Sequence, residues 1–168
     1  MARSWMAAGL VAAWPGPAMA APASIGTSAS TSGTATATVL APVVVTHQPG
    51  AALKFGRFTA GTGGAVVVSP AGSASATGGV ALVPGSLSAA DGFSVEGDPN
   101  RGFAIVTAAG SVSFAGASLA FTTLPSAATG SLNAAGAAGF TIGGTLTVPA
   151  GVAPGSYTGS YSVTVNYN

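Results

Sequence analysis

Large apolar and small polar side chains alternate along GSYTGSYSVTVNYN, residues 155–168, with Gly159 interrupting the apolar positions. Successive side chains of a β-strand point to opposite faces, so a period of two predicts a strand with one buried face. The even-numbered positions of this stretch are all Ser, Thr or Asn. The odd-numbered positions hold Gly155, Tyr157, Gly159, Tyr161, Val163, Val165 and Tyr167.

Shorter stretches with strand-like composition cover most of the remaining chain. TATATVL and PVVVTH (34–47) predict one long strand bent at Pro42, and AVVVSPAGSASA (65–76) predicts a hairpin around a Ser-Pro-Ala-Gly turn. FSVEGDPNRGFAIVTA predicts a second hairpin, with strands 93–97 and 103–108 joined across Asp98-Pro99-Asn100. Further strands are predicted in ALKFGRF (52–58), SVSFAGASLAF (111–121) and GFTIGGTLTV (139–148).

No stretch combines helical spacing of apolar residues with helix caps, so the predicted fold class is all-β. Short strands separated by Gly and Pro are typical of a sandwich or a barrel. Of these two architectures we expect the sandwich. The seven phenylalanines are scattered through the predicted strands and are expected in its core: Phe55, Phe58, Phe93, Phe103, Phe114, Phe121 and Phe140.

Charged residues make up only 4% of the chain, against about 25% in an ordinary soluble domain. With Arg3 removed in a signal peptide, three basic residues balance three acidic ones, so we expect no nucleic-acid partner. The absence of cysteine excludes thiol chemistry and Cys-ligated metals. The six charges are Lys54, Arg57, Arg101, Asp91, Glu96 and Asp98.

The first twenty residues, MARSWMAAGLVAAWPGPAMA, have the features of a secretory signal peptide. A single positive charge precedes a short apolar stretch, and Ala18-Met19-Ala20 predicts cleavage before Ala21. The apolar run is too short to span a bilayer core of ~30 Å. We therefore expect an exported protein with a signal peptide (1–20), a leader (21–33) and one β-sandwich domain (34–168).

The predicted leader, APASIGTSASTSG, contains only one bulky apolar side chain. By itself it cannot repay the entropy cost of ordering, so it is either a flexible segment or a strand that needs a partner. If it is a donor strand, one of its faces carries Ala23, Ile25, Thr27, Ala29 and Thr31.

Residues able to carry out chemistry are few. A catalytic site could combine His47, Asp91 and a serine, but no G-x-S-x-G motif supports it. The three acids do not have the spacing of a calcium loop, and Asp98-Pro99-Asn100 is explained as a turn. We therefore expect no catalytic residues, no metal site and no cofactor. His47 is expected to end a strand.

Three stretches together resemble an exported bacterial family known only as a domain of unknown function, DUF4402. They are LKFGRFTAGTGGAVVVSPAGSASATGGVAL, FSVEGDPNRGFAIV and FTIGGTLTVPAGVAPGSYTGSYSVTVNY. The resemblance covers residues 34–168 and implies no established activity. In layout that family is similar to spore-coat-U-type and fimbrial subunits.

The C-terminal stretch also resembles the subunits of chaperone–usher pili, which end in an alternating strand with a penultimate Tyr. Tyr167 occupies that place here, and Gly155 matches the Gly near the start of that strand. The resemblance implies an immunoglobulin-like sandwich with an incomplete edge, filled first by a periplasmic chaperone and then by the leader of a like subunit. The implied contact residues are Gly155, Tyr157, Tyr161, Val163, Val165 and Tyr167.

The expected function is therefore a structural subunit of a surface fibre or fimbria, assembled by donor-strand complementation. It would pass through the periplasm to the cell surface of a Gram-negative-type bacterium. The alternative is a self-contained secreted sandwich that binds a surface glycan or protein. In that case the leader folds back onto its own domain, or a complete set of strands leaves no groove.

Overall fold

The computed structural model describes Gly26, Ser28 and residues 31–168. The predicted signal peptide and most of the predicted leader lie outside these residues. The chain from Thr38 to Asn168 forms a compact unit. Its secondary structure consists of strands only, and the described residues include no helix long and apolar enough to cross a membrane.

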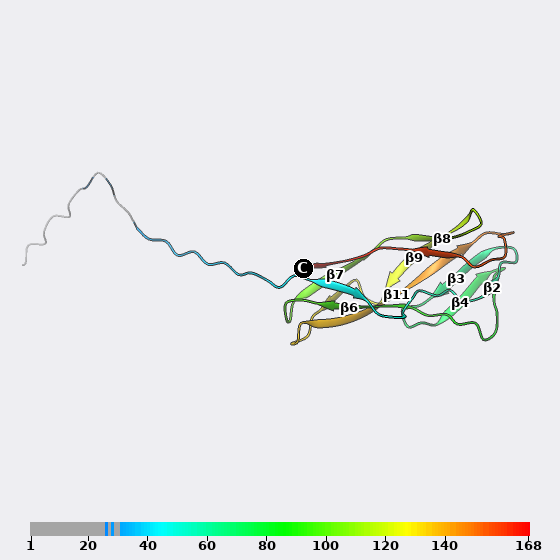
Figure 1. Ribbon diagram of the computed structural model, residues 1–168, viewed down its shortest axis with the longest axis horizontal. Coiled ribbons are helices and arrows are strands. Elements are labelled where there is room, and N and C mark those ends of the chain that lie inside the picture. Colours follow the sequence, from blue (N-terminus) through cyan, green and yellow to red (C-terminus); the bar gives the residue numbers. More distant parts are fainter. Residues whose placement is uncertain (1–25, 27, 29–30) are drawn as a thin grey trace, which may run out of the picture. The chain divides into compact units, whose positions relative to one another are not determined.

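All strand pairings are antiparallel, and they form a β-sandwich as predicted (Figure 1). The strands are β1 (Val44–His47), β2 (Phe58–Thr59), β3 (Gly64–Val68), β4 (Ala74–Gly78), β5 (Ala81–Leu82), β6 (Asp91–Glu96), β7 (Gly102–Thr107), β8 (Gly110–Phe114), β9 (Ala117–Pro125), β10 (Thr129–Ser131), β11 (Ala137–Val148), β12 (Thr158–Ser160) and β13 (Val163–Tyr167).

The largest sheet has the strand order β1-β6-β11-β9-β8-β12, and β3 and β4 extend it from β11. The long strand β11 organises this sheet, because its first half pairs with β6 and its second half with β3 along the same edge. Its other edge pairs with β9. A second sheet has the order β10-β7-β13, and β2 and β5 form a short ribbon.

Two clusters of buried apolar side chains form the core. The first cluster is centred on Val66, Val68, Phe121 and Leu146, and the second on Val95, Phe103 and Ile142. Tyr161 packs against both clusters. The prediction that the phenylalanines are core residues is correct for five of the seven, which are buried: Phe55, Phe93, Phe103, Phe121 and Phe140. It is wrong for Phe114, which is 38% exposed. Phe58 is half-buried.

The prediction of one long strand over residues 34–47 is wrong. Only Val44–His47 forms a strand, and residues 31–42 are exposed and outside any strand. The side chains of this segment are exposed, so they bury too little area to offset the entropy cost of ordering it. In ALKFGRF, too, Lys54 makes a single bridge to Ala89, and only Phe58 enters a strand.

The first predicted hairpin is confirmed, and the second is wrong. β3 pairs with β4 across a turn in which the Gly72 amide donates to the Ser69 carbonyl. β6 and β7 lie in different sheets, because β6 pairs with β1 and β11 while β7 pairs with β10 and β13. The predicted turn after β6, with Asn100 at a φ of 59°, therefore leads the chain from one sheet to the other.

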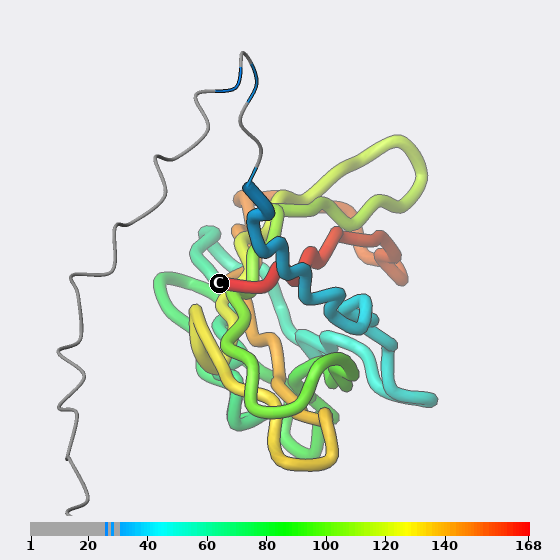
Figure 2. The backbone as a smooth tube through the Cα atoms, turned by 90° about the vertical axis from the view of Figure 1, so that its left-hand side faces the viewer, coloured from blue at the N-terminus to red at the C-terminus, as the bar shows by residue number. Residues whose placement is uncertain are grey.

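The C-terminal alternation forms two strands with different partners. β12 pairs with β8 in the large sheet, and β13 pairs with β7 in the second sheet. The change of sheet occurs at Tyr161 and Ser162, between the two strands. β13 lies side by side with β1, as the red and cyan segments in Figures 1 and 2 show.

Candidate subunit-binding groove

One edge of β13 has no partner strand in the described part of the chain. On the paired side, the Ala108 amide donates to the Ser162 carbonyl at 3.0 Å, and the Asn168 amide donates to the Gly102 carbonyl at 3.1 Å. In an antiparallel pair, the backbone groups of alternate residues point to opposite edges. The even-numbered residues therefore bond to β7, and the N–H and C=O groups of Val163, Val165 and their odd-numbered neighbours face the open edge.

A second open edge belongs to β1. The Gln48 amide donates to the Gly92 carbonyl at 2.9 Å, continuing the ladder between β1 and β6. By the same alternation, the backbone groups of Val45 and His47 face away from β6. No strand among the described residues pairs with this edge of β1. The edges of β1 and β13 thus both lack a partner where the two strands lie side by side.

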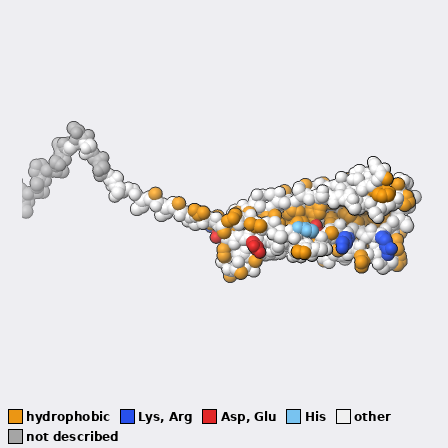
Figure 3. Space-filling view, viewed as in Figure 1, with side chains coloured by type: hydrophobic (Ala, Val, Ile, Leu, Met, Phe, Trp, Pro, Cys, Tyr) orange, Lys and Arg blue, Asp and Glu red, His pale blue; other side chains and the backbone are white. Residues whose placement is uncertain are grey.

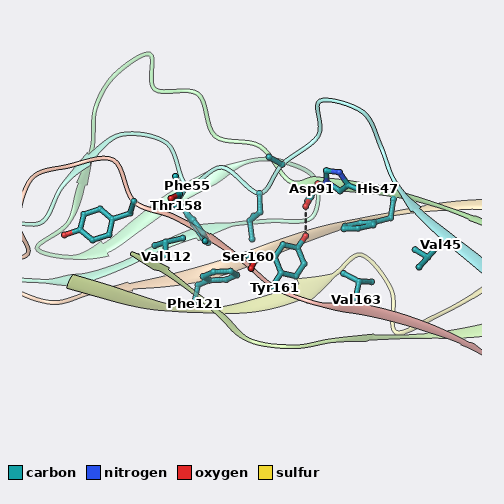
Figure 4. Close-up of a pocket in the computed structure, with 15 residues that line it drawn as sticks. Val45, His47, Phe55, Asp91, Val112, Phe121, Thr158, Ser160, Tyr161 and Val163 are labelled. Atoms are coloured by element: carbon teal, nitrogen blue, oxygen red, sulfur yellow. Dashed lines mark hydrogen bonds and ion pairs between the residues drawn. The ribbon is translucent and has the colours of Figure 1, made fainter. Parts of the chain in front are cut away.

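A hollow of about 650 Å³ lies beside these edges. Figure 3 shows the apolar side chains gathered in a band next to the single histidine, and Figure 4 shows the lining residues. A second hollow of about 860 Å³ shares several of the lining residues and continues toward Val152 and Phe58. We call these two hollows together the groove. The first hollow is lined by Val45, His47, Ala52, Leu53, Phe55, Asp91, Phe93, Val112, Phe121, Tyr157–Tyr161 and Val163.

A polar cluster interrupts this apolar lining (Figure 4). Asp91, which is only 5% exposed, accepts a hydrogen bond from the Tyr161 hydroxyl to Oδ2 at 2.7 Å. Its Oδ1 atom lies 2.7 Å from Nε2 of His47 and accepts a bond from the Gly92 amide at 2.9 Å. Two side chains from distant parts of the chain and the amide of the neighbouring Gly92 therefore hold this carboxylate in place.

The Tyr161 side chain is held in its protonated form. Burial raises the pKa of its hydroxyl well above the usual range, and the hydrogen bond to Asp91 and the charge of that carboxylate raise it further. Its ring also packs edge-on against Phe93 and Phe121, with centroid distances of 6.4 Å and 5.9 Å. Tyr161 therefore acts as a fixed hydrogen-bond donor to Asp91.

The predicted contact residues fall into three groups. Tyr157, Tyr161 and Val163 line the first hollow, and Gly155 lines the second. Val165 is buried in the second core cluster. The Tyr167 hydroxyl donates to the Ala41 carbonyl and accepts from the Asp98 amide. Of the predicted donor positions, Ala23, Ile25, Thr27 and Ala29 lie outside the described residues, and Thr31 is exposed.

The structure brings together two residues that the sequence analysis considered for a catalytic site, His47 and Asp91. His47 ends β1 as predicted. No serine or threonine hydroxyl in the described part of the chain forms a hydrogen bond to its ring; the third partner of the cluster is Tyr161. Asp98 pairs instead with Arg101 at 3.0 Å in the predicted turn, and the described residues contain no cluster of three potential metal ligands.

Sequence reasoning did not assign several groove residues to a contact surface, among them Leu53, Phe55, His47 and Asp91. Leu53 was expected as part of a strand, and Phe55 as part of a strand and of the core. His47 and Asp91 are 44 positions apart, and Asp91 and Tyr161 are 70 apart. No local pattern signals contacts over such separations. An acid at the start of a strand, facing a sheet interior rich in Phe, is the only feature that could have suggested a buried carboxylate.

The model of a family described as Domain of unknown function (DUF4402) matches residues 43–167. Comparisons with curated proteins and with solved structures gave no match.

Proposed function

The chain belongs to the DUF4402 family, and we propose that it is a structural subunit of a bacterial surface fibre or fimbria, assembled by donor-strand complementation. The observation that carries this proposal is the pair of unpaired edges, on β1 and β13, beside an apolar groove. Such edges and apolar patches favour association with another chain in water.

The form of the groove favours a strand as its occupant. Unpaired backbone groups supply a ladder of hydrogen bonds to an extended segment, and the hollow between them takes alternate side chains of that segment. Val45 and Val163 line the hollow where β1 and β13 flank it, so an added strand would cover apolar surface while it satisfies backbone groups.

The leader of a second copy is the occupant that we propose. No charged residue occurs between Ala21 and Pro42, so the segment can enter an apolar groove without burying a charge. The described residues 31–42 are exposed and in no strand, and Val39 is 94% exposed. Because the leader of one copy enters the groove of the next, the contact is head-to-tail and produces a filament.

Before assembly, a periplasmic chaperone would fill the same groove. The predicted signal peptide fits this route, which leads through the periplasm to the cell surface. A subunit of this kind needs no catalytic group or cofactor.

The test is the association state of the mature chain, residues 21–168, measured by size-exclusion chromatography with light scattering. The wild-type chain should form a ladder of oligomers, and Ile25→Asp should reduce it to monomers, since the substitution places a charge on the groove-facing side of the leader. Ser24→Asp, on the opposite side of the same strand, is the matched control and should still form oligomers.

A wild-type chain that stays a monodisperse monomer, and resists protease equally well with residues 21–32 deleted, would overturn the proposal. That result would favour the self-contained secreted sandwich. Binding of the monomer to surface glycans would then be the next measurement.

A further inference from the structure

We propose that the cluster of Asp91, Tyr161 and His47 recognises a threonine hydroxyl of the incoming leader and thereby sets the register of the added strand. This inference rests on the proposed function. It names the part of the groove that distinguishes one alignment of the leader from another.

The cluster lies between two apolar parts of the groove. Val45 and Val163 line the groove near β1 and β13, whereas Leu53, Phe55 and Val112 line it toward the second hollow. Tyr161 packs against both core clusters, so its hydroxyl and Asp91 lie where the two parts meet. A strand with only apolar side chains would cover the Nδ1 atom of His47, which has no partner among the described residues, without bonding to it, which is unfavourable.

The hydrogen bonds already made within the cluster show which kind of ligand group could still bind to it. The Tyr161 proton is used in the bond to Asp91, so its oxygen remains available only as an acceptor. The Nδ1 atom of His47 also has no partner among the described residues, and a hydroxyl can either donate to it or accept from it. No described residue donates to the Tyr161 oxygen. The cluster therefore favours a hydroxyl, and the Asp91 carboxylate disfavours an incoming acid.

The leader offers such donors on the side that would face the groove. In the set Ile25, Thr27, Ala29 and Thr31, two of the four side chains carry a hydroxyl. A hydroxyl that becomes buried requires a hydrogen-bond partner. The two threonines are ~13 Å apart in a strand, so only one of them can contact the cluster in a given alignment. A shift of two residues would place Ala29 there and lose the bond.

The test measures binding of synthetic peptides of residues 21–41 to the mature chain carrying Ile25→Asp, by isothermal titration calorimetry. One of the two substitutions Thr27→Val and Thr31→Val should weaken binding about tenfold, since each removes a hydroxyl and keeps the shape of the side chain. The other substitution should change the dissociation constant by less than about twofold. Ser28→Ala, on the opposite side of the strand, is the control and should bind like the wild-type peptide.

Substitutions in the receiving chain test whether the cluster is the hydrogen-bond partner of the threonine hydroxyl. In a receiving chain with Tyr161→Phe, the ring remains and the oxygen is lost, so the sensitive Thr→Val peptide should bind as well as the wild-type peptide. His47→Gln is a second such variant. We expect it to fold, because half of the His47 side chain is exposed.

The outcomes separate the two proposals. If the wild-type peptide does not bind, the proposed function fails and this inference fails with it. If the wild-type peptide binds but neither Thr→Val peptide is weakened, or both are weakened equally, the cluster does not set the register while the proposed function stands. A tenfold loss that persists with Tyr161→Phe and with His47→Gln would also overturn the inference.

Discussion

The Tyr167 hydroxyl donates a hydrogen bond of 2.9 Å to the carbonyl oxygen of Ala41, which lies 126 positions earlier in the chain. The same hydroxyl accepts a bond of 2.7 Å from the Asp98 amide. One side chain of β13 thus fixes both the segment that leads into β1 and the turn that follows β6. These contacts determine where the exposed segment before β1 leaves the domain.

We expect Tyr167→Phe to lower the free energy of unfolding by about 1–3 kcal/mol, because it removes two hydrogen bonds and leaves the Asp98 amide without its partner. Urea unfolding measures this change. Hydrogen exchange of the Asp98 amide, which donates to the Tyr167 hydroxyl, should also become faster in the variant. Tyr157→Phe is the control, since the Tyr157 hydroxyl bonds only to the nearby Ala153 carbonyl and its loss should cost less. Equal effects of both substitutions would contradict the assigned role.

Val163→Asp should prevent assembly of the mature chain. Its side chain lines the groove, so the carboxylate would be covered by the incoming strand at a large desolvation cost. Thr164→Asp, one position along β13 and exposed, should assemble normally. Analytical ultracentrifugation of the two variants provides the comparison, and a normal oligomer distribution for Val163→Asp would show that this face is not the contact.

The stability of the domain should fall as the pH rises above about 10, the usual pKa of tyrosine in an unfolded chain. Burial and Asp91 raise the pKa of Tyr161 in the folded state, so above this pH the unfolded chain releases a proton that the folded chain keeps. The stabilising contribution is complete below pH ~10 and is lost as the pH increases from there.

Urea unfolding at several alkaline pH values measures this dependence, which should be weaker in Tyr161→Phe. The ultraviolet absorbance of tyrosinate supplies a second readout. In the folded wild-type protein one tyrosine should resist ionisation until the protein unfolds. The number of tyrosines that ionise below the unfolding transition should not change in Tyr161→Phe; a decrease by one would contradict the assignment to Tyr161.

Gly143→Ala should destabilise the domain by about 1–3 kcal/mol, because overpacking a tight interior forces the backbone to shift. A Cβ atom at this position of β11 would lie 2.6 Å from the carbonyl carbon of Ser69 and would also contact the Val68 carbonyl oxygen. Gly33→Ala is the control, since a Cβ there meets open space. Thermal unfolding compares the two, and equal melting temperatures would refute the close approach of β11 to the β3–β4 turn.

The parts of the fold that depend on neighbouring residues could be predicted from the sequence. Alternation in GFTIGGTLTV identified β11, and the Pro and Gly of the Ser69–Gly72 turn identified the β3–β4 hairpin. From Tyr161 to Tyr167 the odd-numbered side chains are also more buried than the even-numbered ones, as the alternation predicted. In each case one segment carries enough information, because side-chain alternation and turn geometry act over a few residues.

The parts that depend on distant pairing could not be predicted. β6 and β7 each satisfy the pattern of a hairpin strand, yet β11 and β13 compete for them and place them in different sheets. The TATATVL segment has β-branched residues, but no partner strand among the described residues pairs with it. For the site, the alternation showed which side chains face inward; it gave no sign that Asp91 and His47 would meet Tyr161.

The change of partner at Tyr161 and Ser162 joins the two layers of the sandwich through a short stretch of chain. A donated strand that pairs along β13 and continues past Tyr161 would hold both layers together, so each copy in a polymer would gain stability from its neighbour. The terminal copy, which has received no strand, would be the weakest. Heating would then shorten such polymers from that end, and a cap or a bound chaperone would be needed there to prevent loss of subunits.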